Sequence, residues 1–250
     1  PLSIAFLYIS AASLNIRQQA SSVKIFECDK IYRYDNGTPS ECYSLAVVFA
    51  GEYRSKEWFN TSPEKFDIYH TKGIFEDVID HLGLDVIFKA DEISFFEADE
   101  SVVVFSGDVK IGHFGRIEKS IAKAFDLKIP VYAAEIDIAA VLSVAKEKYD
   151  FVMWSKFPFT NRDVALILDE NIDSSEIITF VEDYRSKLIK STRVFDLYRK
   201  DPIPKGKKSL GISMLYQSDD RTLTDEEVDS IQQPLVEALC KKFDAVIRDK

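Results

Sequence analysis

The chain has 250 residues, of which 46% are hydrophobic and 30% charged, and its formal net charge is −10. This composition supports one large or two ordinary domains and excludes a globally disordered protein. No apolar run approaches the ~18 residues of a membrane span, the three cysteines are scattered, and the three histidines lack metal-ligand spacing. We therefore expect an intracellular protein without a disulfide framework or a zinc site.

The first 150 residues mix helical and extended patterns, which is typical of an α+β domain. A turn at Gly107-Asp108 joins two β-rich runs and predicts a hairpin, and Gly83 ends an amphipathic helix. We expect these elements to surround an antiparallel sheet. The predicted helices cover 2–14, 66–82, 117–125 and 138–148, and the predicted strands cover 23–26, 45–49, 102–105, 109–112 and a buried strand at 131–136.

A domain boundary is expected near residues 148–158, where a helical pattern ends and Pro158 favours an extended backbone before it. The region after it reads β-α-β-β-α-β, the order of a ferredoxin-like sandwich. Both helices begin with the spacing of a capping box. The predicted strands cover 162–169, 192–198, 209–216 and 245–248, and the predicted helices run from Asp173 to 188 and from Thr224 to 243.

Charge is unevenly distributed along the chain. Residues 1–150 contain 16 Lys and Arg against 24 Asp and Glu, a net charge of −8, and residues 151–250 contain 16 against 18, a net of −2. Within the second part, residues 185–208 contain nine basic residues against two acidic ones, a net of +7. Such a stretch indicates either a local site for a polyanion or a solvated helix end and loop.

Motifs of catalysis are missing from the sequence. It has no G-x-x-x-x-G-K-[ST] phosphate loop, no dinucleotide-binding glycine pattern and no G-x-S-x-G elbow. His113 follows the predicted hairpin and is interpreted as a surface or capping residue. Composition and spacing alone thus indicate a two-domain protein without a visible active site.

Several stretches of both predicted domains are together similar to one known family. They cover 23–27, 66–73, 107–117 and 125–138 in the first domain, and 156–158, 162–165, 206–213 and 219–228 in the second, the last being the most specific. These stretches resemble the β subunit of bacterial phenylalanyl-tRNA synthetase, and those of the second domain resemble its C-terminal anticodon-binding module. The resemblance spans nearly all 250 residues in the expected order.

The resemblance implies the fold and the domains. Residues 1–150 would form a catalytically inactive class II synthetase-like domain with an antiparallel sheet, and residues 151–250 a ferredoxin-like βαββαβ anticodon-binding domain. The chain would be a segment of a longer subunit. An active class II site needs an arginine two positions before an acidic residue, where the segment Lys24-Ile-Phe-Glu27 has Ile25. It also needs a glycine-rich strand and helix ending in arginine, but residues 133–142 contain neither glycine nor arginine. Their acidic Glu135 and Asp137 would repel polyphosphate.

The resemblance further implies a cytoplasmic α2β2 ligase, in which the α subunit activates phenylalanine with ATP and magnesium. This segment would hold no cofactor, pack on the α subunit and bind tRNA, without DNA or a membrane as partner. We expect phosphate neutralisation to dominate RNA binding. The candidate RNA-binding residues are Arg162, Arg193, Arg199, Lys200, Lys205, Lys207, Lys208 and Arg221.

Three alternatives were weighed against this interpretation. An amino-acid sensor of ferredoxin-like fold would have a glycine-rich loop after its first strand, but residues 169–173 are acidic and lack glycine. A generic RNA-binding sheet would have alternating aromatics on its third strand, where 209–216 offers Tyr216 alone. The neighbouring strand should place Val194, Asp196 and Tyr198 on one face. A stand-alone enzyme would need a catalytic constellation.

Overall fold

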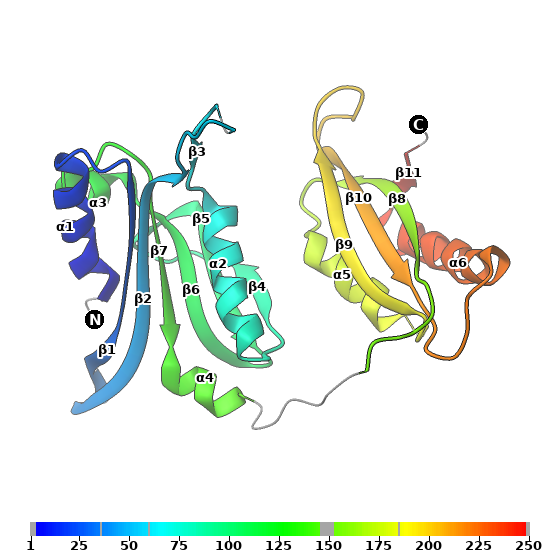
Figure 1. Cartoon of the computed structure of the whole chain (residues 1–250), viewed down its shortest axis with the longest axis horizontal. Helices are drawn as coiled ribbons and strands as arrows, with labels where there is room; N and C mark the ends of the chain where they lie inside the picture. The colour runs from blue at the N-terminus through cyan, green and yellow to red at the C-terminus, as the bar shows by residue number, and fades with distance from the viewer. Residues whose placement is uncertain (1–3, 36, 60, 146–152, 185, 249–250) are drawn as a thin grey trace. The chain divides into compact units, whose positions relative to one another are not determined.

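The computed structural model of the protein describes residues 4–35, 37–59, 61–145, 153–184 and 186–248. The chain divides into two compact units, Pro1–Asp150 and Phe151–Lys250, and each is described by itself. Both units combine an antiparallel sheet with helices (Figure 1). The α+β class expected from the sequence is therefore confirmed.

One sheet carries the core of the first unit. Its strands lie in the order β1-β2-β7-β6-β5-β4, with β3 paired to β2, and all of these pairs are antiparallel. Helices α1 and α3 contribute to the core on one face, and α2 and α4 to the core on the other (Figure 1). The bounds are α1 Ile4–Arg17, β1 Ser22–Asp35, β2 Thr38–Arg54, β3 Glu64–Lys65, α2 Ile68–His81, β4 Ile87–Ala90, β5 Phe96–Ser106, β6 Val109–Ile117, α3 Lys119–Ala124, β7 Val131–Asp137 and α4 Ile138–Val144.

Strand β7 lies inside this sheet and is buried from Val131 to Ile136. Val131 and Ala133 pack in the core beneath α1 and α3, whereas Ala134 and Ile136 pack in the core beneath α2 and α4. Helices on both faces therefore explain why this strand is a continuous apolar run, as predicted. The predicted hairpin at Gly107 is also present as β5 and β6, with φ = +57° at that glycine.

Strands β1 and β2 are much longer than predicted, at 14 and 17 residues. They form a continuous hairpin in which Ser22 pairs with Gly51 and Asp35 with Thr38. In the outer part of this hairpin the exposed face carries the aromatic residues Phe26, Tyr32 and Tyr34, whereas the charged Glu27 and Asp29 lie on the opposite face. Apolar and polar residues therefore do not separate onto two faces as in a typical half-buried strand, and the strands predicted from the sequence are too short.

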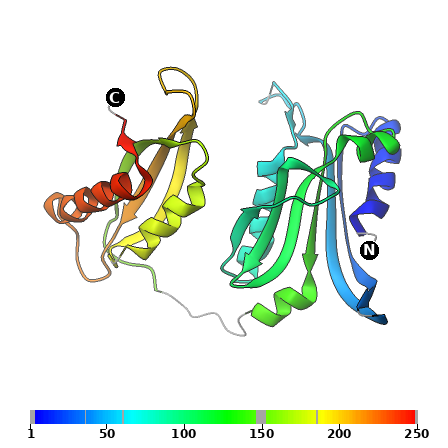
Figure 2. The ribbon, with the colours of Figure 1, turned by 180° about the vertical axis from the view of Figure 1, so that it is seen from behind.

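The second unit is a four-stranded sheet with two helices on one face. The strand order β11-β8-β10-β9 is that of the ferredoxin-like fold, so the predicted sandwich is confirmed. Figure 2 shows α5 and α6 together on one side of the sheet, where their apolar residues meet those of β8 and β10. The bounds are β8 Thr160–Asp169, α5 Ser174–Asp183, β9 Ile189–Tyr198, β10 Lys207–Tyr216, α6 Asp225–Phe243 and β11 Val246–Ile247.

Both helices of this unit start where their caps predict. The backbone N–H of Thr224 donates to the Glu227 carboxylate at 3.0 Å, and the N–H of Glu227 donates to the Thr224 hydroxyl at 3.3 Å. The Asp173 N–H donates to the Glu176 carboxylate at 3.3 Å in the same way. Because these contacts satisfy donors that a helix cannot satisfy internally, they fix each start. Helix α5 ends at Asp183, earlier than expected.

A β-bulge in β9 changes which side chains share a face. Val194 pairs with Ile212, a core residue, whereas Asp196 pairs with Gly211 and Tyr198 pairs with Ser209. Directly paired residues point to the same side of a sheet. Tyr198 and Asp196 therefore lie on the face opposite the helices and Val194 lies on the helix face, so the predicted common face was wrong. The extra residue of the bulge causes this switch.

Candidate nucleic-acid interface

The C-terminal part of the basic stretch, residues 199–206, forms the connection between β9 and β10. Four cations, Arg199, Lys200, Lys205 and Lys207, line an open pocket of about 570 Å³ together with Glu170. The loop is held in place by Ile203, whose side chain is buried, and by the Tyr198 hydroxyl, which donates to the Asp201 carbonyl at 2.7 Å. Gly206 closes the loop with φ = +76°, a conformation that glycine adopts without strain. The structure thus brings these four predicted site residues together.

Lys208 was predicted in the same cluster, but its side chain is buried. Its ammonium donates to the carbonyls of Glu170 at 3.0 Å and Ile172 at 2.5 Å. Desolvation and the nearby Arg199 charge lower the pKa of Lys208. Lys208 therefore anchors the β8–α5 connection from beneath and does not present its charge at the surface.

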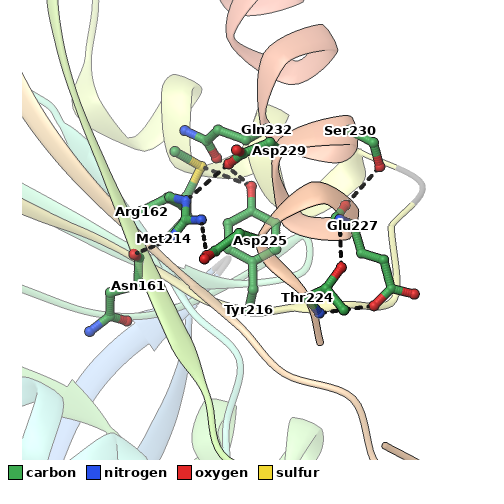
Figure 3. Close-up of polar contacts among 10 residues, drawn as sticks. All are labelled: Asn161, Arg162, Met214, Tyr216, Thr224, Asp225, Glu227, Asp229, Ser230 and Gln232. Atoms are coloured by element: carbon green, nitrogen blue, oxygen red, sulfur yellow. Dashed lines mark hydrogen bonds and ion pairs between the residues drawn. The ribbon is translucent and has the colours of Figure 1, made fainter. Parts of the chain in front are cut away.

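Arg162 lies on the helix side of β8 and contacts the start of α6 (Figure 3). Its guanidinium donates to Asp225 at 2.7 Å and to Asp229 at 3.2 Å. The hydrogen bond to Asp225 raises the pKa of Arg162, and that to Asp229 adds to the effect. Two carboxylates therefore compensate this charge, and the residue joins strand to helix, away from the basic loop.

Arg193 and Arg221 are the remaining predicted residues, and they lie apart from each other. Arg193 is exposed on β9 and pairs with Ser213, which places it on the sheet face opposite the helices. Arg221 precedes α6 and forms an ion pair with Glu227, a residue of the capping box. Arg193 therefore belongs to a surface next to the basic loop, whereas Arg221 supports the start of α6.

The sheet face opposite the helices carries aromatic residues that the sequence analysis missed. Phe195 is 51% exposed, and its ring lies over Gly211, where a Cβ atom would come within 2.9 Å of it. The Arg248 guanidinium carbon lies 5.1 Å from the centre of the Tyr198 ring. Tyr216, the aromatic residue considered before, is fully buried on the helix side, with its hydroxyl 2.5 Å from the Gln232 side-chain oxygen. The bulge in β9 hid this arrangement from strand periodicity.

The first unit has a polar pocket of about 240 Å³ at the sheet. Its lining includes Ser44 of β2, Lys110 and His113 of β6, and Glu135 and Asp137 of β7. His113 Nε2 lies 3.5 Å from a Glu135 carboxylate oxygen, and both side chains are largely buried. Glu135 and Asp137, the two acidic residues singled out in the sequence, thus line one pocket together with Lys110 and His113.

In β1, the residues compared with a nucleotide-binding motif, Ile25 and Glu27, make contacts within the first unit. Ile25 packs against the core beneath α1, and the Glu27 carboxylate accepts a hydrogen bond from the Tyr8 hydroxyl at 2.8 Å. A second stretch has the spacing of an arginine two positions before an acidic residue, namely Arg33 and Asp35 at the hairpin end of β1.

Within the part of the chain that the structure describes, no group of three or more His, Cys, Asp or Glu residues is placed to hold a metal ion. None of the helices in those described residues has the length and apolar character needed to cross a membrane.

Comparison with known proteins matches both units. The family profile described as "Phenylalanyl tRNA synthetase beta chain CLM domain" matches residues 3–138, and "Ferredoxin-fold anticodon binding domain" matches residues 155–248. Relatives named phenylalanine–tRNA ligase beta subunit include those of Syntrophotalea carbinolica (32% identity), Geobacter sulfurreducens (30%) and Staphylococcus epidermidis (31%). Each alignment covers 96% of this chain and 30% of the relative, so the chain spans under a third of their length. The chain belongs to the phenylalanyl-tRNA synthetase β-chain family.

Proposed function

We propose that this chain provides a scaffold and a tRNA-binding surface within a phenylalanine–tRNA ligase of the cytoplasm. The α subunit of an α2β2 assembly would activate phenylalanine with ATP and magnesium, and the first unit would pack against that subunit. Family membership supports this proposal, because the matched relatives are named β subunits of that ligase. The observation that carries the RNA-binding part is the basic β9–β10 loop in a unit matched to anticodon-binding domains.

The proposed RNA contact combines two neighbouring surfaces. Arg199, Lys200, Lys205 and Lys207 of the loop would neutralise phosphates. Arg193, Phe195 and Tyr198 extend from that loop along the exposed sheet face, where aromatic rings can stack on bases. Lys208 is left out of the proposed contact because it is buried, and Arg162 and Arg221 because their carboxylate partners belong to helix α6, away from the loop. Arg199 also pairs with a carboxylate, that of Glu170 at 3.5 Å, but this pair lies within the loop pocket itself.

The test of this contact is a combined Lys200→Ala, Lys205→Ala, Lys207→Ala variant titrated with tRNA at several salt concentrations. Losing three phosphate contacts should weaken binding and flatten the slope of log K against log salt by about two to three units. A matched control replaces Lys119, Lys123 and Lys128 of the first unit, which are exposed and carry the same total charge. Equal affinity and slope in the two variants would place the RNA contact elsewhere.

We also propose that the first unit binds no ATP. The support is the pocket lined by Glu135 and Asp137 and the core position of Ile25, whereas the spacing of Arg33 and Asp35 argues in the other direction. Calorimetric titration of the chain with ATP and phenylalanine should give no saturable heat, with a complex that contains the α subunit as the positive control. A micromolar ATP affinity of the isolated chain would contradict the proposal, and its loss in an Arg33→Ala variant would identify the residue responsible.

A further inference from the structure

The outer half of the β1–β2 hairpin has one covered and one exposed face. Ile25 and Ile31 pack into the core beneath α1 on one side. On the other side, four aromatic residues remain exposed, with fractions of 72% for Phe26, 74% for Tyr32, 81% for Tyr34 and 50% for Tyr43. In Figure 1 this hairpin extends past α1 at the lower left.

The strand register places these four side chains on one surface. Phe26 pairs with Val47, and Lys30 pairs with Tyr43, while Tyr32 and Tyr34 follow Lys30 at two-residue intervals. Val47 packs against the core beneath α2 and α4. The aromatic residues therefore continue the α2/α4 side of the sheet outward along its edge strand. We call the surface of Phe26, Tyr32, Tyr34 and Tyr43 the hairpin face.

The size of the hairpin face matches a protein interface. With about 200 Å² for each aromatic side chain, the exposed fractions amount to roughly 550 Å² of exposed aromatic surface. That is near the upper end of the largest apolar patches on monomeric proteins, at about 300–600 Å². It is also about two-thirds of the ~800 Å² that each partner buries in an interface of standard size.

The charges around the hairpin face favour a protein over a nucleic acid. Lys30 forms a 2.8 Å ion pair with Glu41, and its ammonium lies 5.6 Å from the centre of the Tyr43 ring. Lys24 donates to the Tyr53 carbonyl at 3.1 Å and lies over aromatic rings. Both lysines are thus engaged locally, and the remaining surface of the hairpin face is apolar.

We propose that the hairpin face docks an apolar surface of the α subunit. This inference rests on the proposed function, which supplies a partner subunit, and it adds the surface through which the first unit meets that partner. Tyrosine and phenylalanine side chains at the centre of interfaces commonly carry most of the binding energy. The four aromatic residues are therefore the expected hot spots.

The test is binding of the α subunit to a Phe26→Glu, Tyr34→Glu variant of the chain. Affinity should fall about 100-fold or more, because two hot-spot rings are replaced by charges that the interface would have to desolvate. A Trp58→Glu, Tyr69→Glu variant is the matched control. It also replaces two exposed aromatic residues, at 93% and 72% exposure, but outside the hairpin face, and should bind like the unmodified chain.

The outcomes separate this inference from the proposed function. If the unmodified chain does not bind the α subunit, the assembly itself is wrong. If both variants bind as tightly as the unmodified chain, the hairpin face is not the docking surface. A further outcome is that the unmodified chain self-associates and only the hairpin variant loses this association. A second copy of the chain would then occupy the hairpin face, which overturns the inference. If the hairpin variant fails to fold, amide hydrogen exchange of residues 26–34 is measured in the unmodified chain with and without the α subunit. Docking should slow this exchange, and an unchanged exchange rate contradicts docking.

Discussion

Two adjacent lysines have opposite roles at the start of β10. Lys207 lines the basic pocket, whereas Lys208 is buried and donates to two backbone carbonyls. The alternation of a strand accounts for the difference, since Lys208 shares its side with the core residues Leu210 and Ile212. Periodicity along 207–216 could have excluded Lys208 from the RNA contact. The prediction that Lys208 contacts RNA rested on its charge alone.

The buried ammonium should make stability depend on pH at alkaline values. Because burial lowers the pKa of Lys208 below 10.5, the folded state binds fewer protons than the unfolded state between that lowered pKa and about 10.5. The contribution of this group to the free energy of unfolding therefore rises with pH in that window. A Lys208→Met variant should lose this rise, as measured by urea unfolding at several pH values from 7 to 10.5. The Lys207→Met control should keep it, and parallel curves for all three proteins would disprove the effect.

At the scale of the element, α6 contains a proline in its interior. Pro234 is exposed at the tenth position of this 19-residue helix, between buried Val228 on one side and buried Leu235 and Leu239 on the other. Proline cannot donate the backbone hydrogen bond that the carbonyl four residues earlier would accept, here that of Ser230. The capping box of Thr224 and Glu227 and the apolar face of the helix offset this loss.

A Pro234→Ala variant should therefore stabilise the second unit. The change restores a hydrogen bond and removes a helix penalty of about 3 kcal/mol, while freeing the unfolded chain costs about 0.4–1 kcal/mol. Because the surrounding helix has already adapted to the proline, we expect a net gain of about 1–2 kcal/mol in the free energy of unfolding. Urea unfolding measures it, with Gln233→Ala as the control at the neighbouring exposed position, expected within ~0.5 kcal/mol of the unmodified chain. A destabilised variant would mean that the proline kink is required by the fold.

Elements that depend on residues close together in the sequence were predicted well, and features that depend on distant contacts were not. Capping boxes at Asp173 and Thr224 located two helix starts, because each is a contact between residues three positions apart. The bulge in β9 depends on pairing with β10 and has no local signal, so the aromatic sheet face was missed. Arg162 likewise meets Asp225 and Asp229 only in the folded unit, more than 60 residues away. Contacts of this kind decide which charges remain at the surface, which explains why the candidate site was predicted less well than the fold.

At the scale of the whole molecule, each unit has core clusters of its own. The second unit is built on one cluster that includes Leu166, Ile212 and Leu239. The first unit has separate clusters on the two faces of its sheet, with Val48 in one and Phe75 in another. Each set draws its residues from within a single unit. Each unit therefore has the apolar burial that cooperative folding requires.

Thermal unfolding should accordingly proceed in two transitions that respond to different substitutions. Phe75→Ala removes a ring that is 2% exposed in the first unit, and Leu166→Ala removes a fully buried side chain in the second. Each should cost about 3 kcal/mol or more through lost burial and the cavity left behind. For units of this size that corresponds to roughly 6–12 °C in the first transition and 12–24 °C in the second. Differential scanning calorimetry should show each variant moving one transition and leaving the other in place, while Leu142→Ala, at a position 70% exposed, moves neither. A single transition shifted by both core variants would mean that the two units unfold as one cooperative body.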